Sequence, residues 1–297
     1  MENKVIVAVS GGPDSMYLLV KLMDKNLELV VAHVNYNLRK QSINEEKYLR
    51  EFCKENNIKI CVKNIVDDDW KKYSYLKNKQ SIAREIRYSF FQEVSKKNNI
   101  DTIYIGHHKD DFIETAIMQS DKSEDYFFYG IKEKSKYKNL IIKRPLLNIY
   151  KNEIIKKLDE KKIKYFLDET NYKPIYERNR IRKTLSSKTS LEKNKMFLDY
   201  QEINKSKSSF YNKSEKLYCE FSKKNYSWDY YNSLDIIYKK SIIYKLLIES
   251  KNRININKNK LDSIIVFLEK KNPQKKYRLM KNIFITVKSS NIIILSK

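Results

Sequence analysis

The N-terminal segment is apolar and ends in a glycine turn. Residues 5–9 read Val-Ile-Val-Ala-Val, which is typical of a strand buried on both faces of a sheet. Gly11 and Gly12 follow almost at once, and the apolar spacing of residues 16–22 predicts a helix behind them. A strand that turns through glycines into a helix directs backbone N–H groups at an anion. The segment therefore predicts an anion site at the first turn of an α/β fold.

Glycine is rare in this sequence, which makes the turn informative. The chain has 4 Gly and 4 Pro, yet Gly11, Gly12 and Pro13 are consecutive. Glycine permits a positive φ and lets a ligand approach the backbone closely. An ordinary strand-to-helix turn is the alternative, but the hydroxyls of Ser10 and Ser15 favour a phosphate site. The segment is not a Walker A loop, because the spacing and the lysine of that motif are absent.

The length and the charge of the chain limit its organisation and its partners. A sequence of 297 residues favours about two domains. Its formal net charge of +24 favours a polyanionic partner, with nucleic acid as the first candidate, although the many Lys, Asn, Ile and Tyr residues also suit a biased genome. The 23 tyrosines offer surfaces on which unpaired bases can stack.

Cysteine usage and hydropathy favour a soluble, cytoplasmic protein without a membrane partner. Cys53, Cys61 and Cys219 form no C-x-x-C pair, and a sparse, odd count suits a reducing compartment. We expect no signal peptide before the first strand, and no apolar run approaches the roughly 20 residues of a membrane span. The sequence leaves the oligomeric state open, with a homodimer as one alternative.

Segments with strand and helix patterns alternate through the first part of the chain. The expected strands are residues 5–9, 29–34, 58–66, 102–106 and 164–167, and the expected helices begin near residues 16, 42, 82, 110 and 149. The polar residues 67–79 are expected to form a loop or lid. This alternation predicts a doubly wound parallel sheet, in which ligands bind beyond the carboxyl ends of the strands.

A smaller domain is expected after residue 185. Residues 200–271 have a mainly helical pattern, and the alternation in 277–280, 283–287 and 292–295 predicts a small terminal β-hairpin. Residues 186–297 are basic and carry no catalytic motif. Two roles therefore stay open for this domain, namely holding a nucleic acid and packing.

All three histidines fall at the carboxyl ends of expected strands. His33 ends the second strand, and His107 and His108 follow the fourth, at the same edge of the sheet as Ser10. Since ligands bind at this edge, the histidines favour a functional site over structural burial. A zinc site is a weaker alternative, because His107 and His108 lack further ligands at a recognised spacing.

An acidic cluster follows the two adjacent histidines. Asp110, Asp111 and Glu114 lie at a helix start, where the helix dipole favours carboxylates, and capping is therefore one interpretation. Asp111 and Glu114 are three residues apart and share a helix face. Two carboxylates at a strand end can bind an ammonium group or a magnesium ion. In so basic a chain, this cluster favours a cationic ligand.

Six segments resemble the motifs of one enzyme family. Residues 10–15, Ser-Gly-Gly-Pro-Asp-Ser, are similar to the SGGxDS signature of the PP-loop ATP pyrophosphatases, which cleave ATP between the α and β phosphates. Residues 107–115 resemble the HHxDDxxET motif of the tRNA(Ile)-lysidine synthases. Four more segments resemble that family's HVNHxLR, ARxxRY, RPLL and D-x-[ST]-N…RNxxR motifs, at residues 33–39, 83–88, 144–147 and 168–182. The resemblance covers residues 5–182 in the family's order.

Two departures from the family pattern are visible. Tyr36 and Asn37 replace a usual His-Gly pair, which affects local detail. After Thr115 the family commonly has an LxRG stretch, whereas here residues 118–121 lead into a polar segment that extends to residue 139. Any RNA contacts of this segment are therefore not predictable from the family.

The resemblance implies a ligase that uses ATP and Mg²⁺. It would join free lysine to C2 of the wobble cytidine in the isoleucine tRNA with a CAU anticodon, through an adenylated cytidine, and give lysidine, AMP and pyrophosphate. One alternative is another tRNA-modifying enzyme of the PP-loop type, but a thiolase would need catalytic cysteines and the cysteines lie outside every motif. A non-catalytic RNA-binding protein is a second alternative, against which the intact loop and acidic cluster argue.

The matching motifs imply roles for individual residues of this chain. The resemblance implies ATP binding by Ser10, Gly11, Gly12, Pro13, Asp14, Ser15, His33 and Asn35, and Mg²⁺ binding by Asp14 and Asp110. It implies catalytic roles for Arg84, Arg87, His107, Asp111 and Glu114, of which Asp111 and Glu114 also bind the lysine amines. It implies contacts to tRNA phosphates by Arg178, Asn179 and Arg182, with a surface ion-pair network as the alternative for the arginines. Residues 1–185 would form the PP-loop ATPase catalytic domain and residues 186–297 a basic tRNA-contacting domain.

Overall fold

The computed structural model describes residues 4–38, 41–76, 78–120, 128–167, 177–250, 254 and 256–296. The chain forms two compact units, one of residues 1–115 and 130–197 and the other of residues 116–129 and 198–297. Arg39 and the predicted motif at 168–171 lie outside the described residues. The functional assignment of the two predicted domains stays a prediction.

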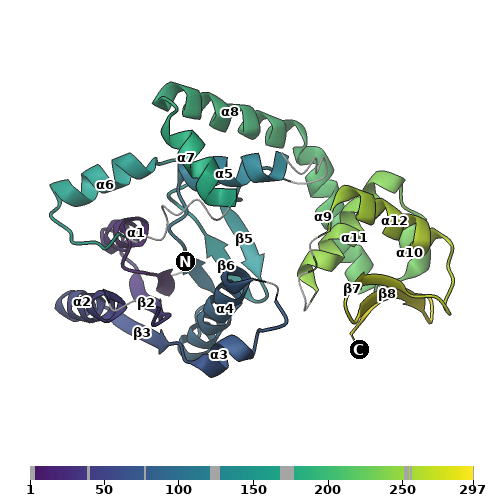
Figure 1. Cartoon of the computed structure of the whole chain (residues 1–297), viewed down its shortest axis with the longest axis horizontal. Helices are drawn as coiled ribbons and strands as arrows, with labels where there is room; N and C mark the ends of the chain where they lie inside the picture. Colours follow the sequence, from purple (N-terminus) through teal and green to yellow (C-terminus); the bar gives the residue numbers. More distant parts are fainter. Residues whose placement is uncertain are drawn as a thin grey trace. The chain divides into compact units, whose positions relative to one another are not determined.

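The first unit is built on a six-stranded sheet of order β3-β2-β1-β4-β6-β5 (Figure 1). Its strands are β1 (Lys4–Ala8), β2 (Glu28–Asn35), β3 (Lys59–Asn64), β4 (Thr102–Tyr104), β5 (Lys134–Tyr137) and β6 (Leu140–Lys143). All neighbouring strands pair in parallel except β5, which is antiparallel to β6 at the edge. The predicted doubly wound, mainly parallel sheet is confirmed.

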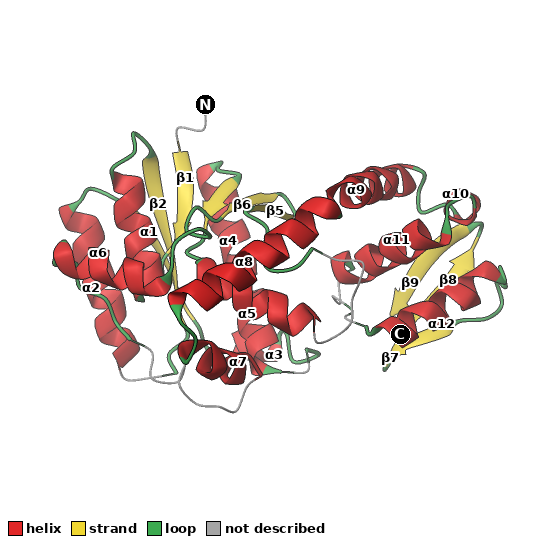
Figure 2. Cartoon of the chain, turned by 90° about the horizontal axis from the view of Figure 1, so that it is seen from above, coloured by secondary structure: helices red, strands yellow, loops and turns green. Residues whose placement is uncertain are grey.

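Helices cover both faces of this sheet because its central strands are apolar on both faces (Figure 2). The helices of this part of the chain are α1 (Pro13–Met23), α2 (Gln41–Glu55), α3 (Asp67–Lys71), α4 (Lys79–Asn98), α5 (Lys109–Ser120), α6 (Lys151–Glu160), α7 (Glu177–Ser186) and α8 (Ser190–Ser206). Val5 and Val7 of β1 pack with buried residues of α1, α2 and α6. Ile6, between them, packs on the other face with Tyr88 and Phe91 of α4. The alternation of side chains along a strand produces these two cores.

Two local predictions were wrong. Residues 164–167 form no strand; instead the backbone N–H of Phe166 donates a hydrogen bond to Gly11 O at 3.0 Å, so this segment packs on the glycine turn. The predicted loop at 67–79 begins with the short helix α3. Its first turn holds three aspartates, which the helix dipole favours, and Asp69 accepts a hydrogen bond from the Val66 N–H.

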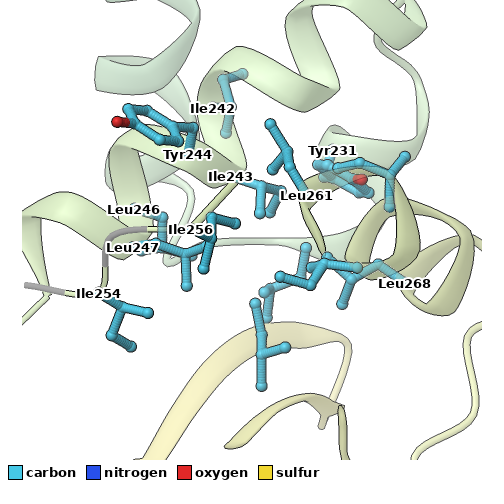
Figure 3. Close-up of a cluster of buried hydrophobic side chains, with 14 of the residues drawn as sticks. Tyr231, Ile242, Ile243, Tyr244, Leu246, Leu247, Ile254, Ile256, Leu261 and Leu268 are labelled. Carbon is cyan, nitrogen blue, oxygen red and sulfur yellow. The ribbon is translucent and has the colours of Figure 1, made fainter. Parts of the chain in front are cut away.

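The second unit packs helices against a small sheet around its own core (Figure 3). Its elements are α9 (Ser208–Lys223), α10 (Trp228–Asn232), α11 (Ile236–Glu249), α12 (Lys258–Glu269), β7 (Tyr277–Met280), β8 (Ile283–Lys288) and β9 (Asn291–Ser296). Ile243 and Leu247 of α11 are fully buried beside Ile264 of α12. The three strands form an antiparallel sheet, one strand more than the predicted hairpin, because all three alternating segments pair.

Every helix that the structure describes is either too short or too polar to span a lipid bilayer.

Candidate active site

The glycine turn joins β1 to α1 and is held by serine hydroxyls. Gly11 has φ +90°, a conformation that favours glycine, and Gly12 precedes the first residue of α1, Pro13. Ser15 Oγ donates to Gly12 O at 2.9 Å and accepts from the Ser10 N–H at 3.1 Å. These bonds fix the loop so that the first amides of α1 lie at the carboxyl edge of the sheet.

Gly106, two residues after β4, lies directly against the backbone of Asp14 at the start of α1. A Cβ atom on Gly106 would lie 2.8 Å from the backbone oxygen of Asp14. Such a distance is too short for any side chain, so Gly106 is required for this close approach. This close approach places His107 and His108, which follow Gly106, next to the glycine turn. That is the edge of the sheet at which the sequence predicted them.

A cavity of about 290 Å³ opens where β1, β2 and β4 end. The predicted site residues that line it are Ser10, Gly12, Asp14, Ser15, Arg87, His107 and Asp111. Tyr36, Tyr88 and Phe91 also line it, although no motif or spacing in the sequence predicted a role for them. Aromatic and apolar walls around a few converging polar groups are typical of small-molecule sites.

His33 and Asn35 support the strand ends from behind the cavity. Nδ1 of His33 lies 2.8 Å from Val9 O, and because a carbonyl oxygen only accepts, this nitrogen carries the proton. Burial lowers the pKa of His33, so its ring is neutral. Asn35 donates to Glu46 Oε2 at 3.0 Å and accepts from the Asn37 N–H at 2.9 Å. Both residues order the backbone beside the turn.

His108 is buried among three carboxylates. Its Nε2 lies 3.3 Å from Asp111 Oδ2 and 3.7 Å from Asp14 Oδ1, and its Nδ1 lies 3.5 Å from Asp110 Oδ2. Burial alone would lower the pKa of His108, but Asp111, Asp110 and Asp14 together raise it above its ordinary value. Asp110 also accepts from the Lys151 N–H at 3.0 Å, so it joins α5 to the start of α6.

Asp111 and Glu114 are paired with arginines of α7. Arg178 donates to Glu114 Oε2 at 2.7 Å and to Asp111 Oδ1 at 2.9 Å. Arg182 donates to Glu114 Oε1 at 2.8 Å and to Oε2 at 3.0 Å. Asn179 lies on the same helix. In this structure, the predicted lysine site and the predicted tRNA-binding arginines are one ion-pair network.

The charges in this network keep the Asp111 carboxylate ionised. Burial would raise the pKa of Asp111, but the nearby charges of His108 and Arg178 hold that pKa well below its ordinary value. Asp111 Oδ2 also accepts from the His108 backbone N–H at 3.0 Å. Asp111 therefore stays charged throughout the physiological pH range.

Two arginines of α4 take different positions. Arg87 lines the cavity, as a group that contacts phosphate would. The guanidinium carbon of Arg84 lies 4.7 Å from the centre of the Tyr88 ring, in a cation–π contact. Of these two predicted residues, Arg87 is the one that the structure brings to the cavity.

Two cations near the site had no clear signal in the sequence. Lys151 Nζ lies 3.5 Å from Asp14 Oδ2, beside the glycine turn. Lysine is too abundant in this chain for one residue to stand out. Arg144 lies in the RPLL-like motif but received no role, and its Nε donates to His107 Nδ1 at 3.0 Å.

Among the described residues, no group of three His, Cys, Asp or Glu side chains has the arrangement of a metal site. The zinc alternative therefore gains no support. Asp14 does have a buried oxygen, Oδ1, that accepts no hydrogen bond in the described structure.

Comparisons with known proteins identify the family. Residues 1–189 match the family model described as a PP-loop domain. The tRNA(Ile)-lysidine synthase of Ureaplasma parvum is 41% identical over 292 residues, which cover 98% of this chain and 87% of that protein. The chain belongs to the tRNA(Ile)-lysidine synthase family. A second member, from Malacoplasma penetrans, is 38% identical over 297 residues, which cover 99% of each chain.

A solved structure supports the same fold. The U34-tRNA thiolase NcsA from Methanococcus maripaludis, solved with its [4Fe-4S] cluster, superposes with a TM-score of 0.55. It is 20% identical in sequence, and the match covers 68% of this chain and 72% of that one. At this identity the likeness concerns the fold alone.

Proposed function

We propose that this chain ligates lysine to C2 of the wobble cytidine in the isoleucine tRNA with a CAU anticodon, at the expense of ATP. One observation carries the proposal: a cavity at the strand ends is lined together by the glycine turn, His107 and Asp111, in a chain of this family. These are the groups that an adenylation followed by attack of an amine requires. The reaction gives lysidine, AMP and pyrophosphate.

The glycine turn would hold the pyrophosphate part of ATP. The amides at the start of α1 and the hydroxyl of Ser10 are donors for phosphoryl oxygens. Gly11 and Pro13 shape the turn, and His33 and Asn35 keep the neighbouring backbone in place. Lys151 and Arg87 would add positive charge on two sides, as phosphate clamps do.

Asp14 is the residue that best fits a magnesium ion. Its Oδ1 atom is buried and accepts no hydrogen bond from the described residues, and Mg²⁺ prefers carboxylate oxygens. Asp110 fits less well, because its Oδ2 atom already accepts a hydrogen bond from the Lys151 N–H. When bound, Mg²⁺ would neutralise negative charge on the phosphates. Asp14 is therefore the proposed ligand.

Two bond exchanges make up the reaction. The cytosine O2 atom attacks the α phosphorus, and pyrophosphate leaves. An amine of lysine then attacks C2, the C2–O2 bond breaks, and AMP leaves while the amine loses a proton. His107 would donate a hydrogen bond near the α phosphate, where negative charge develops. Asp111 or Glu114 would accept the proton of the attacking amine.

The arginines of α7 set a condition for lysine binding. The carboxylates of Asp111 and Glu114 already accept hydrogen bonds from Arg178 and Arg182. A lysine ammonium can replace them only if the guanidinium groups move to another anion. Phosphates of tRNA are suitable anions for such groups. We therefore assign both arginines to tRNA in the working complex, and lysine binding then follows tRNA binding.

The second unit would hold the body of the tRNA. Helix α9 exposes Lys213 and Lys216, which can contact phosphates without reading sequence. This role suits a cytoplasmic enzyme, where tRNA and ATP are available.

A thiolase on the same scaffold is the second candidate, and the cysteines argue against it. Cys53 is fully buried, and burial raises the pKa of its thiol to about 11. None of the described residues lining the cavity is a cysteine. The chain therefore offers no thiolate at the site.

Separate assays of pyrophosphate and AMP would test the proposal. Purified protein is incubated with Mg²⁺, ATP and the tRNA, with or without lysine. We expect one equivalent of pyrophosphate per enzyme without lysine, and release of AMP only when lysine is added. Release of AMP without lysine, or no pyrophosphate at all, would contradict the two-step scheme. Asp111→Asn should form pyrophosphate but release little AMP.

A further inference from the structure

Among the described residues, the hydrogen-bond partners of the buried cation Arg144 are all uncharged. It follows β6 and is 6% exposed. Its NH1 donates to Lys132 O at 2.7 Å and to Ser135 Oγ at 2.9 Å, and its Nε donates to His107 Nδ1 at 3.0 Å. Tyr88 also forms a hydrogen bond with its side chain. A buried guanidinium without a carboxylate is costly, which indicates that its position serves a purpose beyond stability.

The bond from Arg144 determines where His107 carries its proton. A guanidinium group only donates, so Nδ1 of His107 must accept with its lone pair. In a neutral imidazole whose Nδ1 accepts, the proton is on Nε2. Protonating Nδ1 as well would place an N–H and a positive charge against Arg144. The contact therefore excludes the imidazolium form as well as the other tautomer.

The other charged groups around His107 also lower its pKa, except for one carboxylate. Burial is the largest cause that lowers the pKa of His107, to about 3, and the charges of Arg144, Arg178 of α7 and Arg87 of α4 add to it. Asp111 of α5 opposes them. The ring is therefore neutral at physiological pH.

We propose that Arg144 is a positioning residue that fixes His107 as a neutral Nε2–H donor facing the cavity. This inference rests on the proposed function, in which the α phosphate lies there. His107 then stabilises the phosphoryl oxygens by a hydrogen bond and does not transfer a proton. Arg144 itself does not line the cavity, so its contribution passes through the histidine ring.

Nitrogen NMR of the histidines would test this directly. The chain has 3 histidines, so ¹⁵N-histidine labelling gives few signals, and His107→Gln identifies those of His107. We expect a non-protonated Nδ1 and a protonated Nε2 in the ligand-free protein, unchanged between pH 5 and pH 8. A protonated Nδ1, or titration within this range, would overturn the inference. This readout needs no activity, so it is independent of the proposed function.

Two variants of Arg144 extend the test. Arg144→Met removes the donor but keeps an unbranched side chain, and we expect the His107 tautomers to mix and kcat to fall about 10- to 100-fold with little change in KM for ATP. Arg144→Lys retains a donor and should keep the Nε2–H tautomer. If Arg144→Met folds by circular dichroism and His107 stays entirely in the Nε2–H form, Arg144 does not control the tautomer. If Arg144→Met does not fold, the wild-type and Arg144→Lys spectra decide.

Discussion

The guanidinium group of Arg182 donates two hydrogen bonds to Glu114, from Nε at 2.8 Å and from NH2 at 3.0 Å. The Glu114 side chain is 2% exposed, whereas that of Arg182 is 35% exposed. Arg178 adds a third bond to the same carboxylate. The charge of a buried carboxylate is thus balanced by two arginines that are partly exposed. A larger anion could therefore reach both guanidinium groups.

Glu114→Gln should weaken lysine binding while preserving the shape of the site. Loss of one charge-assisted contact costs about 1.5–3 kcal/mol, so we expect KM for lysine to rise about tenfold to a hundredfold. KM for ATP should change little, because Glu114 does not line the cavity. Steady-state lysine incorporation measures both constants. Glu51→Gln, on the exposed face of α2, is the matched control, and equal lysine KM values for the two variants would refute the assignment.

Lysine should bind weakly to the free protein and more tightly once tRNA is present. Arg178→Gln removes a competitor of the lysine ammonium, so it should strengthen lysine binding without tRNA and weaken tRNA binding. Calorimetry with lysine and filter binding with tRNA measure the two effects. Arg180→Gln, on the exposed side of α7, should change neither. Weaker lysine binding by the Arg178→Gln protein would show that the arginine assists lysine instead of competing with it.

Two glycine substitutions should separate stability from ATP binding. In Gly106→Ala the new Cβ would lie 2.8 Å from Asp14 O, which is backbone, so we expect a loss of about 1–3 kcal/mol in the free energy of unfolding. In Gly12→Ala the nearest atom is Ser10 Oγ at 3.5 Å, an ordinary contact. Its stability should be nearly unchanged while ATP binds less tightly, because phosphate approaches that backbone. Denaturant unfolding measures the stability of both variants, and titration with ATP measures their affinity. If Gly12→Ala binds ATP as tightly as the wild type, the glycine turn does not contact the phosphates.

The free energy of unfolding should fall as the pH is lowered from 6 to 4.5, a window in which His108, whose pKa is raised, stays protonated in the folded chain and opposes the trend little. His33 and His107 have pKa values below their ordinary 6.5 in the folded protein, so the unfolded chain binds more protons in this window. The stability that neutral histidines provide is therefore complete above about pH 7 and decreases as the pH falls below 6.5. Urea unfolding at several pH values measures the slope. His107→Gln should flatten it, and an identical slope in that variant would mean that His107 is not neutral in the folded state.

The sequence predicted the elements whose signals are local. The apolar run 5–9, the scarce glycines and the helix behind them placed β1, the turn and α1 correctly. Strands β5 and β6 were not predicted: Lys134–Tyr137 is four residues long, contains two lysines and lies at an antiparallel edge, and Leu140–Lys143 is an equally short segment beside it. Residues 164–167 look like a strand, yet Phe166 packs on Gly11, a contact that no periodicity reveals.

Contacts between distant residues were the part of the site that no local pattern could provide. Arg178 and Glu114 are 64 residues apart, and only the folded chain shows that they pair. The same holds for Arg144 and His107, which belong to two motifs with no visible link in the sequence. The motifs identified which residues matter, and the fold shows which of them act on each other.

The most direct measurement is the chemical identity of the wobble nucleoside after reaction. Purified protein is incubated with ATP, Mg²⁺, lysine and the CAU-anticodon isoleucine tRNA, and the digested RNA is analysed by mass spectrometry. A transcript with uridine at the wobble position is the control. The account predicts lysine joined to the wobble cytidine in the first RNA and no modification in the second. Unmodified cytidine despite pyrophosphate release, or lysine joined to the uridine transcript, would contradict it.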